Sequence, residues 1–176
     1  YGLGTSGFAT SLIIGLYLIG MITGALLFPL VARLLTPRIT LIAAALLVAL
    51  GYLMFLPLHD SYTQVVTNMV IAGIGSGALV AALPAAAASA APATQTGVAT
   101  GLTNSVKTVG GAIASAVFGM ALMHGVGEAA TGGGETAGSL SGYFTVWAVC
   151  GVTALVAAVL LCFVPKQAFT DAAQHT

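Results

Sequence analysis

The segment Leu-Ile-Ala-Ala-Ala-Leu-Leu-Val-Ala-Leu, residues 41–50, contains no polar side chain. It lies within an apolar run from about Ile39 to Leu58, and a helix needs about 20 mostly apolar residues to cross a bilayer. The whole chain is similar in character: 59% of its 176 residues are hydrophobic, 5% are charged, and the mean hydropathy is +1.07. A soluble domain carries about 25% charged residues. The sequence therefore predicts an all-α integral membrane protein surrounded by a lipid bilayer.

Outward from this segment, four more apolar runs have the length of a membrane span. The five predicted spans cover about residues 11–32, 39–58, 62–91, 98–123 and 143–164. The connections between them are rich in Pro, Gly and polar residues, which break helices. The longest connection contains Gly132-Gly133-Gly134, a composition typical of a flexible linker. We expect a polytopic helix bundle with a cytoplasmic tail at 165–176, and because Tyr1 is not Met, we expect the chain to be a piece of a longer protein.

The few positive charges predict how the chain is oriented. Arg33 and Arg38 flank the first short loop, and Lys166 follows the last span. Lys and Arg in short loops favour the cytoplasmic side. The loops that contain Asp60 and the two glutamates Glu128 and Glu135 carry no Lys or Arg and then lie outside. We therefore expect a multi-pass protein of the cell (inner) membrane, with its amino end outside and its carboxyl end in the cytoplasm.

Small residues at helical spacing divide the spans into two kinds. Such residues let helix backbones approach closely in lipid, where packing drives association. They recur in the first, third and fourth spans, as Gly20 and Gly24, as Gly73 and Gly77, and as Gly111 and Gly119. The second and fifth spans are apolar on nearly every face. We expect a packed core of the first, third and fourth helices, with the second and fifth at the lipid-facing periphery.

Polar groups at membrane depth mark candidate functional residues. Asn68 opens the third span, and Asn104, Thr108 and Ser115 share one face of the fourth because they are spaced by four or seven residues. An ionisable side chain inside a span is a functional candidate. Lys107 has two interpretations: it extends to the cytoplasmic surface, or it lines a cavity. Pro84 predicts a kink in the third helix.

Other classes of site have no support in the sequence. No Asp or Glu falls inside a predicted span, and no His, Cys or carboxylate cluster has metal-ligand spacing. We expect His59, His124 and His175 to be solvated. No nucleophile motif and no basic patch is present, so we predict no enzyme activity, no metal site, no cofactor and no nucleic-acid partner.

Two stretches resemble a known family. One comprises Gly73-Ile74-Gly75-Ser76-Gly77, Ala82-Leu83-Pro84, Pro92, Gly97-Val98-Ala99-Thr100-Gly101-Leu102-Thr103-Asn104 and Lys107-Thr108-Val109-Gly110-Gly111-Ala112-Ile113. The other comprises Tyr1-Gly2-Leu3-Gly4 and Pro29-Leu30-Val31-Ala32-Arg33 with Arg38. Together they resemble the carboxyl-terminal half of fourteen-span drug:proton antiporters, a branch of the major facilitator superfamily. Ala32 stands where the family's loop often has Asp, and Lys107 where it commonly has Arg.

The resemblance implies a partial carboxyl-terminal bundle, whose partner is the missing amino-terminal half of the same transporter. It implies proton-coupled efflux of drugs or other hydrophobic or cationic small molecules by alternating access, with the proton gradient as energy source. The implied path residues are Asn68, Asn104, Thr108 and Ser115, with Arg33, Arg38 and Lys107 as anchors at the inner face. Two alternatives stay open: a permease of the same fold for a specific metabolite, and a membrane scaffold or remnant without transport.

Overall fold

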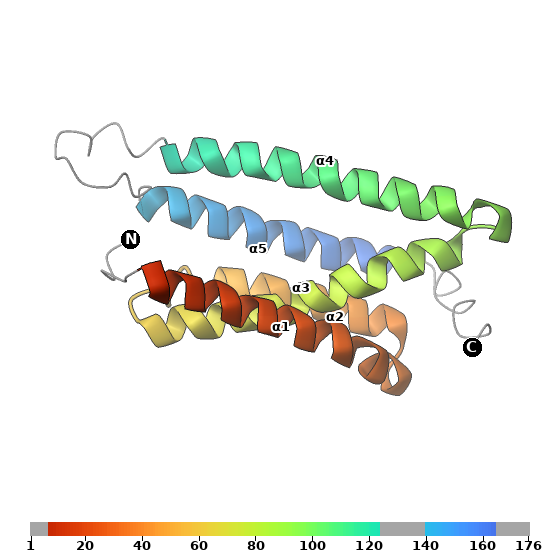
Figure 1. Ribbon diagram of the computed structural model, residues 1–176, viewed down its shortest axis with the longest axis horizontal. Helices are drawn as coiled ribbons and strands as arrows, with labels where there is room; N and C mark the ends of the chain where they lie inside the picture. Colours follow the sequence, from red (N-terminus) through yellow and green to blue (C-terminus); the bar gives the residue numbers. More distant parts are fainter. Residues whose placement is uncertain (1–6, 124–139, 165–176) are drawn as a thin grey trace.

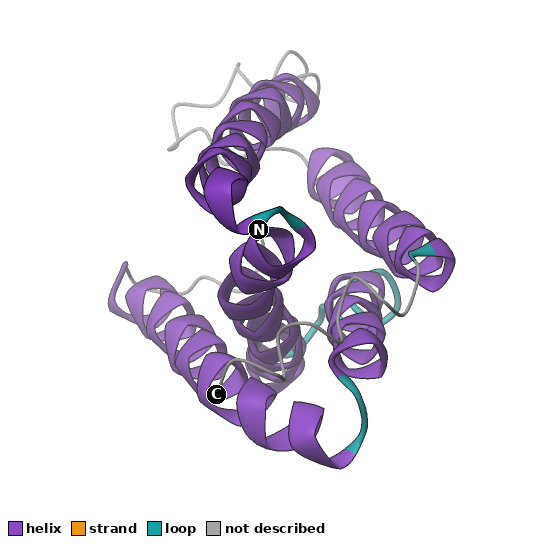
Figure 2. Cartoon of the chain, turned by 90° about the vertical axis from the view of Figure 1, so that its right-hand side faces the viewer, coloured by secondary structure: helices purple, strands orange, loops and turns teal. Residues whose placement is uncertain are grey.

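The computed structural model describes residues 7–123 and 140–164, and within them it contains five α-helices and no strand (Figures 1 and 2). The elements are α1 (Gly7–Leu34), α2 (Pro37–Leu53), α3 (Tyr62–Ala90), the short 3₁₀ helix η1 (Ala93–Gln95), α4 (Thr96–Met123) and α5 (Leu140–Phe163). All α-helices except α2 are long and apolar enough to cross a membrane, and α2 has 17 residues. The predicted all-α helix bundle is confirmed. The predicted tail at 165–176, the Gly-rich linker and Lys166, Glu128, Glu135, His124 and His175 lie outside the described residues.

Proline and a capping threonine set the two ends of α2. Thr36 accepts a hydrogen bond from the Ile39 N–H at 3.3 Å, and Pro37 occupies the first turn, where its missing N–H costs nothing. The helix ends at Leu53, five residues before the predicted limit at Leu58. The ring of Pro57 would clash with the Leu53 carbonyl if the helix continued. The chain instead turns tightly, with the Leu58 N–H donating to the Met54 oxygen at 2.9 Å.

The helices define two ends of the bundle, which we call the His59 end and the Arg38 end. The His59 end holds the connection from α2 to α3 and the start of α5. The Arg38 end holds the connections from α1 to α2 and from α3 to α4, together with the end of α5. In the connection from α3 to α4, the backbone of Ala91 is extended (φ −95°, ψ 148°), as expected for a residue before proline.

Helix α3 lies at the centre, with α1 against one face and α2 against the other. Gly73 and Gly77 are about 40° apart around the helix, whereas Gly75 is about 200° from Gly73. A Cβ added at Gly73 would lie 2.6 Å from the carbonyl oxygen of Tyr17 in α1. A Cβ added at Gly75 would lie 2.5 Å from the carbonyl oxygen of Ala44 in α2. The glycines on alternating sides of this segment therefore let the backbone of α3 lie in direct contact with the backbones of α1 and α2.

The contact of α1 with α3 has small residues on both sides. A Cβ added at Gly20 of α1 would lie 2.9 Å from the Val70 carbonyl oxygen, and one added at Gly24 would lie 2.7 Å from the Ile74 carbonyl carbon. From the other helix, a Cβ at Gly77 would lie 2.6 Å from the Met21 carbonyl carbon. We call these four positions, Gly20, Gly24, Gly73 and Gly77, the glycine seam. No side chain larger than hydrogen fits there unless the two helices separate.

The expected peripheral place of α2 is wrong, and α4 has no buried residue in the part of the chain that the structure describes. Buried residues of α2 include Ala44, Ala45 and Ala49, whereas α4 has none. Alanine side chains are small enough for α2 to pack closely between α3 and α5, so an apolar surface on every side did not mean a lipid-facing helix. Nothing lies within 4 Å of a Cβ added at Gly111 or Gly119 of α4, in contrast to the glycine seam.

The ribbon of α3 changes direction in its second half and rises toward α4 (Figure 1). Pro84 lies in this part of α3, and the helix continues through it to Ala90. Proline bends a helix because it removes one backbone hydrogen bond and its ring crowds the preceding turn. The bend takes the end of α3 away from α1, and among the described elements α4 packs against α3, η1 and α5.

Candidate functional site

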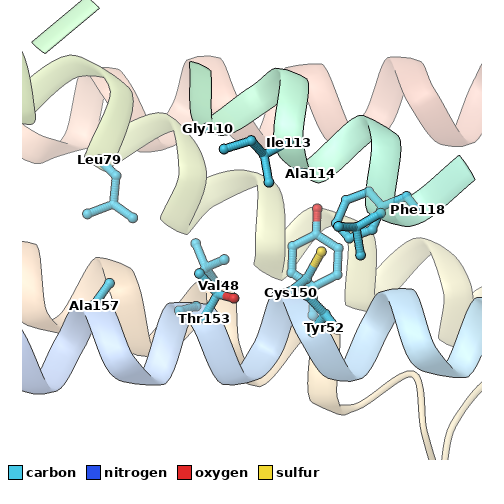
Figure 3. A pocket seen from close by; sticks show the side chains of 13 residues that line it. Val48, Tyr52, Leu79, Gly110, Ile113, Ala114, Phe118, Cys150, Thr153 and Ala157 are labelled. Carbon is cyan, nitrogen blue, oxygen red and sulfur yellow. The ribbon is translucent and has the colours of Figure 1, made fainter. Parts of the chain in front are cut away.

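A cavity of about 520 Å³ lies between α4 and α5, with α2 and α3 as its floor (Figure 3). Its lining residues are Val48, Tyr52, Leu79, Gly110, Ile113, Ala114, Val117, Phe118, Val149, Cys150, Thr153, Ala154 and Ala157. Only Tyr52, Cys150 and Thr153 among them carry a polar side-chain atom. The cavity is thus an apolar space with few groups that could orient a polar ligand.

Figure 3 shows how the side chains divide this space. Phe118 of α4 approaches Tyr52 and Cys150 toward one end, and Leu79 and Ala157 lie toward the other. The Tyr52 hydroxyl also interacts with the side chain of Tyr17 from α1. None of these residues was predicted from the sequence, because a tyrosine and a cysteine within an apolar run resemble ordinary span residues.

The predicted path residues of α4 lie on a different face from the cavity. Successive residues of a helix are about 100° apart, so Asn104, Thr108 and Ser115 point about 120–160° away from Gly110. All three are exposed, and none lines the cavity. Thr108 donates a hydrogen bond to the Asn104 carbonyl at 2.9 Å, while the Asn104 side chain makes no such bond to another described residue. We call Asn104, Thr108, Gly111, Ser115 and Gly119 the polar face of α4.

Asn68 is buried in this structure and is held by a hydrogen bond. Its side chain is 1% exposed, and its Nδ2 donates to the Leu58 carbonyl oxygen at 2.9 Å. That carbonyl belongs to the turn after α2 and would otherwise lack a helical partner. In this conformation Asn68 therefore holds the turn between α2 and α3, and its predicted place on the substrate path stays a prediction.

Two of the predicted anchor residues have clear positions at the Arg38 end. Arg38 donates from Nε to the Leu161 oxygen at 3.4 Å, and from its guanidinium to the Cys162 oxygen. The last carbonyls of a helix lack partners and carry partial negative charge, so a cation stabilises them. Arg33 is exposed at the end of α1.

Lys107 lies on the Arg38 side of the cavity. It is three residues, or about 4.5 Å along α4, nearer the Arg38 end than the cavity residue Gly110. Its side chain is exposed.

The His59 end holds an aromatic cluster that was not predicted from the sequence. Phe55 stacks on Trp147 with ring centroids 4.8 Å apart, and His59 meets Phe144 edge-on at 4.9 Å. The expectation that His59 is solvated is wrong, since 23% of its side chain is exposed and its Nδ1 is buried. Aromatic residues near the end of one span and the start of another were the available signal, because such residues gather at membrane interfaces.

No group of three or more metal-binding side chains occurs in the described ranges 7–123 and 140–164. Comparison with known proteins gives the family. The model of the Major Facilitator Superfamily matches residues 1–175, whereas no curated protein and no solved structure matches the chain. The match spans nearly the whole chain and agrees with its long apolar helices. The chain therefore belongs to the major facilitator superfamily, a family of membrane transporters.

Proposed function

We propose that this chain is the carboxyl-terminal part of a proton-coupled antiporter that exports hydrophobic or cationic small molecules. Alternating access would come from this bundle rocking against the amino-terminal half of the same transporter around a site near the membrane midplane. The observation that carries the proposal is the polar face of α4, which lies at membrane depth and is exposed along its whole length.

This face is unsuited to contact with lipid. Moving an amide or hydroxyl into an apolar medium without a hydrogen-bond partner costs about 2–7 kcal/mol, depending on the reference state. Thr108 satisfies its hydroxyl within the helix, but the exposed amide of Asn104 has no partner among the described residues. The opposite face carries Leu102, Val109 and Met120, which suit lipid or an apolar partner. The polar face is therefore the side of α4 that we assign to a water-filled pathway.

The loose packing of α4 supports the presence of a larger partner. Helix α3 has close neighbours on two faces, whereas α4 touches α5 closely near one end, where a Cβ at Gly142 would lie 2.5 Å from the Ala121 oxygen. The apolar cavity beside Gly110 and Ile113 then separates the two helices. Apolar side chains from the rest of the transporter would fill part of this space.

The cations give the orientation that we propose. Arg33 and Arg38 lie at one end of the bundle, Lys107 lies in the half of α4 nearer that end, and Asp60 lies at the other end. Positive charge favours the cytoplasmic side, so the Arg38 end would face the cytoplasm of a cell that carries this protein in its inner membrane. The choice of a drug-efflux substrate rests on the motif resemblance described above.

The test is transport by the full-length carrier in inverted membrane vesicles, with a fluorescent lipophilic cation as substrate and an imposed pH gradient. Gly111→Leu places a large side chain on the polar face and should reduce transport at least several-fold without preventing membrane insertion. Ala116→Leu is the matched control, since it adds the same side chain on the lipid-facing side of α4.

Each outcome has a definite meaning. Unchanged transport in Gly111→Leu would remove the polar face of α4 from the mechanism. Transport of the lipophilic cation at the same rate with and without the pH gradient would reject proton coupling. Accumulation of no tested compound by a correctly inserted carrier would favour the scaffold or remnant.

A further inference from the structure

The cavity between α4 and α5 has the size and the lining of a site for an apolar molecule. Its volume of about 520 Å³ lies within the range of about 300–1,000 Å³ that is usual for ligand pockets. Most of the residues around it carry no polar side-chain atom, and apolar cavities of this kind exclude water but take up apolar molecules. The interior therefore suits a hydrocarbon chain.

The cavity is continuous with apolar surface that is exposed on both helices. On α4, Ile113 lines the cavity and is exposed, and the exposed Val109 lies about 40° further round the helix, on the lipid-facing side. On α5, Val149 lines the cavity and is exposed, as is Val152 one turn further on. A hydrocarbon chain can therefore enter the cavity sideways from the bilayer.

Lys107 places a cation on the same side of α4 as the cavity. Successive helix residues are about 100° apart, so Lys107 points about 60° from Gly110, between the directions of Ala114 at about 40° and Phe118 at about 80°. Gly110, Ala114 and Phe118 all line the cavity (Figure 3). Lys107 follows these residues toward the Arg38 end, and its side chain is exposed. The apolar cavity thus has a positive charge beside one end.

No carboxylate of the described residues can pair with this charge. Lys107 is eleven residues, or about 16 Å, from the first residue of α4, Thr96. A charge at such a depth in a span is costly and is almost always paired. Within residues 7–123 and 140–164 the one carboxylate side chain belongs to Asp60, at the opposite end of the bundle. The negative partner of Lys107 must therefore come from outside this part of the chain.

We propose that the cavity and Lys107 together bind an anionic phospholipid, with an acyl chain in the cavity and the phosphate against the Lys107 ammonium group. Lysine binds phosphate as a point charge, and a phospholipid joins this anion to a hydrocarbon chain in one molecule. The bound lipid would connect α4 to α5 along the part of their length that the cavity separates. The proposal does not depend on the substrate of the transporter.

The test is photolabelling of the full-length carrier in nanodiscs of phosphatidylcholine. One sample contains a trace of phosphatidylglycerol with a diazirine in the middle of an acyl chain, and the other contains diacylglycerol with the same chain and no phosphate. Mass spectrometry of peptides then locates the label. We expect phosphatidylglycerol to label residues 110–118 and 149–157 about fivefold more than diacylglycerol does, which is the effect of one cation near an anionic lipid.

Substitutions separate the charge from the cavity. Lys107→Gln should lower the phosphatidylglycerol label to the level of diacylglycerol, and Lys107→Arg should keep it because the charge remains. Ala114→Trp fills the cavity and should prevent labelling of both segments. Ala116→Trp is the matched control, since Ala116 is exposed and does not line the cavity.

Four results would overturn the proposal. Equal labelling by the two probes would show ordinary contact with lipid, and absence of label from both segments would show that side chains of the rest of the transporter fill the cavity. An unchanged label in Lys107→Gln would exclude the charge. Loss of the label in excess inorganic phosphate would indicate a site for a free anion. Transport is not measured, so a failure of the proposed efflux function would leave this test unaffected.

Discussion

The glycine seam predicts that one methyl group at Gly77 will destabilise the bundle more than the same group elsewhere. In Gly77→Ala the new Cβ would overlap the Met21 carbonyl, lying 2.6 Å from its carbon and 2.7 Å from the Met21 Cα. Ordinary van der Waals contacts of a Cβ are 3.4 Å or longer, so the backbones of α1 and α3 must separate by roughly 1 Å. The obstructing atoms are backbone atoms, and no side-chain rotation can relieve the contact.

The magnitude follows from two opposing terms. Overpacking a tight contact costs about 1–3 kcal/mol and occasionally more. Replacing glycine by alanine inside a helix contributes up to about 1 kcal/mol of stability. In Gly15→Ala only the second term applies, because nothing lies within 4 Å of a Cβ at Gly15. We therefore expect Gly77→Ala to be about 1–3 kcal/mol less stable than Gly15→Ala.

The assay is thermal or denaturant unfolding of the purified protein in one detergent, followed by circular dichroism. Both variants replace glycine by alanine within a membrane helix, so changes in helix propensity and hydrophobicity cancel in the comparison. Equal stability of the two variants would refute the direct contact between the backbones of α1 and α3, and with it the central position of α3.

Three other predictions concern the ends of the bundle. Arg38→Ala should destabilise the junction of α2 with α5 by about 1.5–3 kcal/mol, the range for hydrogen bonds of charged groups. Arg38→Lys should restore only part of this stability because lysine lacks the planar fork of arginine. Limited proteolysis near the end of α5 measures the loss. Phe55→Ala should cost about 3–5 kcal/mol by unfolding, as for a fully buried phenylalanine, whereas Phe163→Ala, at a position 79% exposed, should change stability little. Asn68→Leu should lower the free energy of unfolding by about 1–3 kcal/mol because it leaves the Leu58 carbonyl without its partner. Substrate preference in the vesicle assay should be unchanged. A variant with full stability and altered preference would place Asn68 in the pathway.

Local sequence rules account for the helices but not for their neighbours. Apolar runs, Pro37 after Thr36, and Pro92 after Ala91 mark helix ends because backbone geometry acts over a few residues. The sequence also contained a signal for the early end of α2, since Pro57 disfavours a regular helix beyond Leu53, but the continuous apolar run suggested a longer helix. Which helices pack together depends on shapes that meet only in the fold.

The candidate site shows the same limit. The polar face of α4 could be recognised from spacing alone, because Asn104, Thr108 and Ser115 belong to one helix. Asn68 could not be assigned in this way, since its partner Leu58 lies in a turn whose position depends on the fold. His59 and Trp147 are 88 residues apart in the sequence, so no local pattern predicts that they share a cluster.

The central claim is that the polar face of α4 borders water while its opposite face does not. The most direct test uses single cysteines in a carrier whose other cysteines, Cys150 and Cys162 of this chain included, are replaced by serine. Asn104→Cys, Thr108→Cys and Ser115→Cys form one set, and Leu102→Cys, Val109→Cys and Met120→Cys form the opposite set. With the full-length carrier in membranes and a charged, membrane-impermeant thiol reagent, we predict modification of the first set at least tenfold faster than the second. Equally slow modification of both sets would contradict the account.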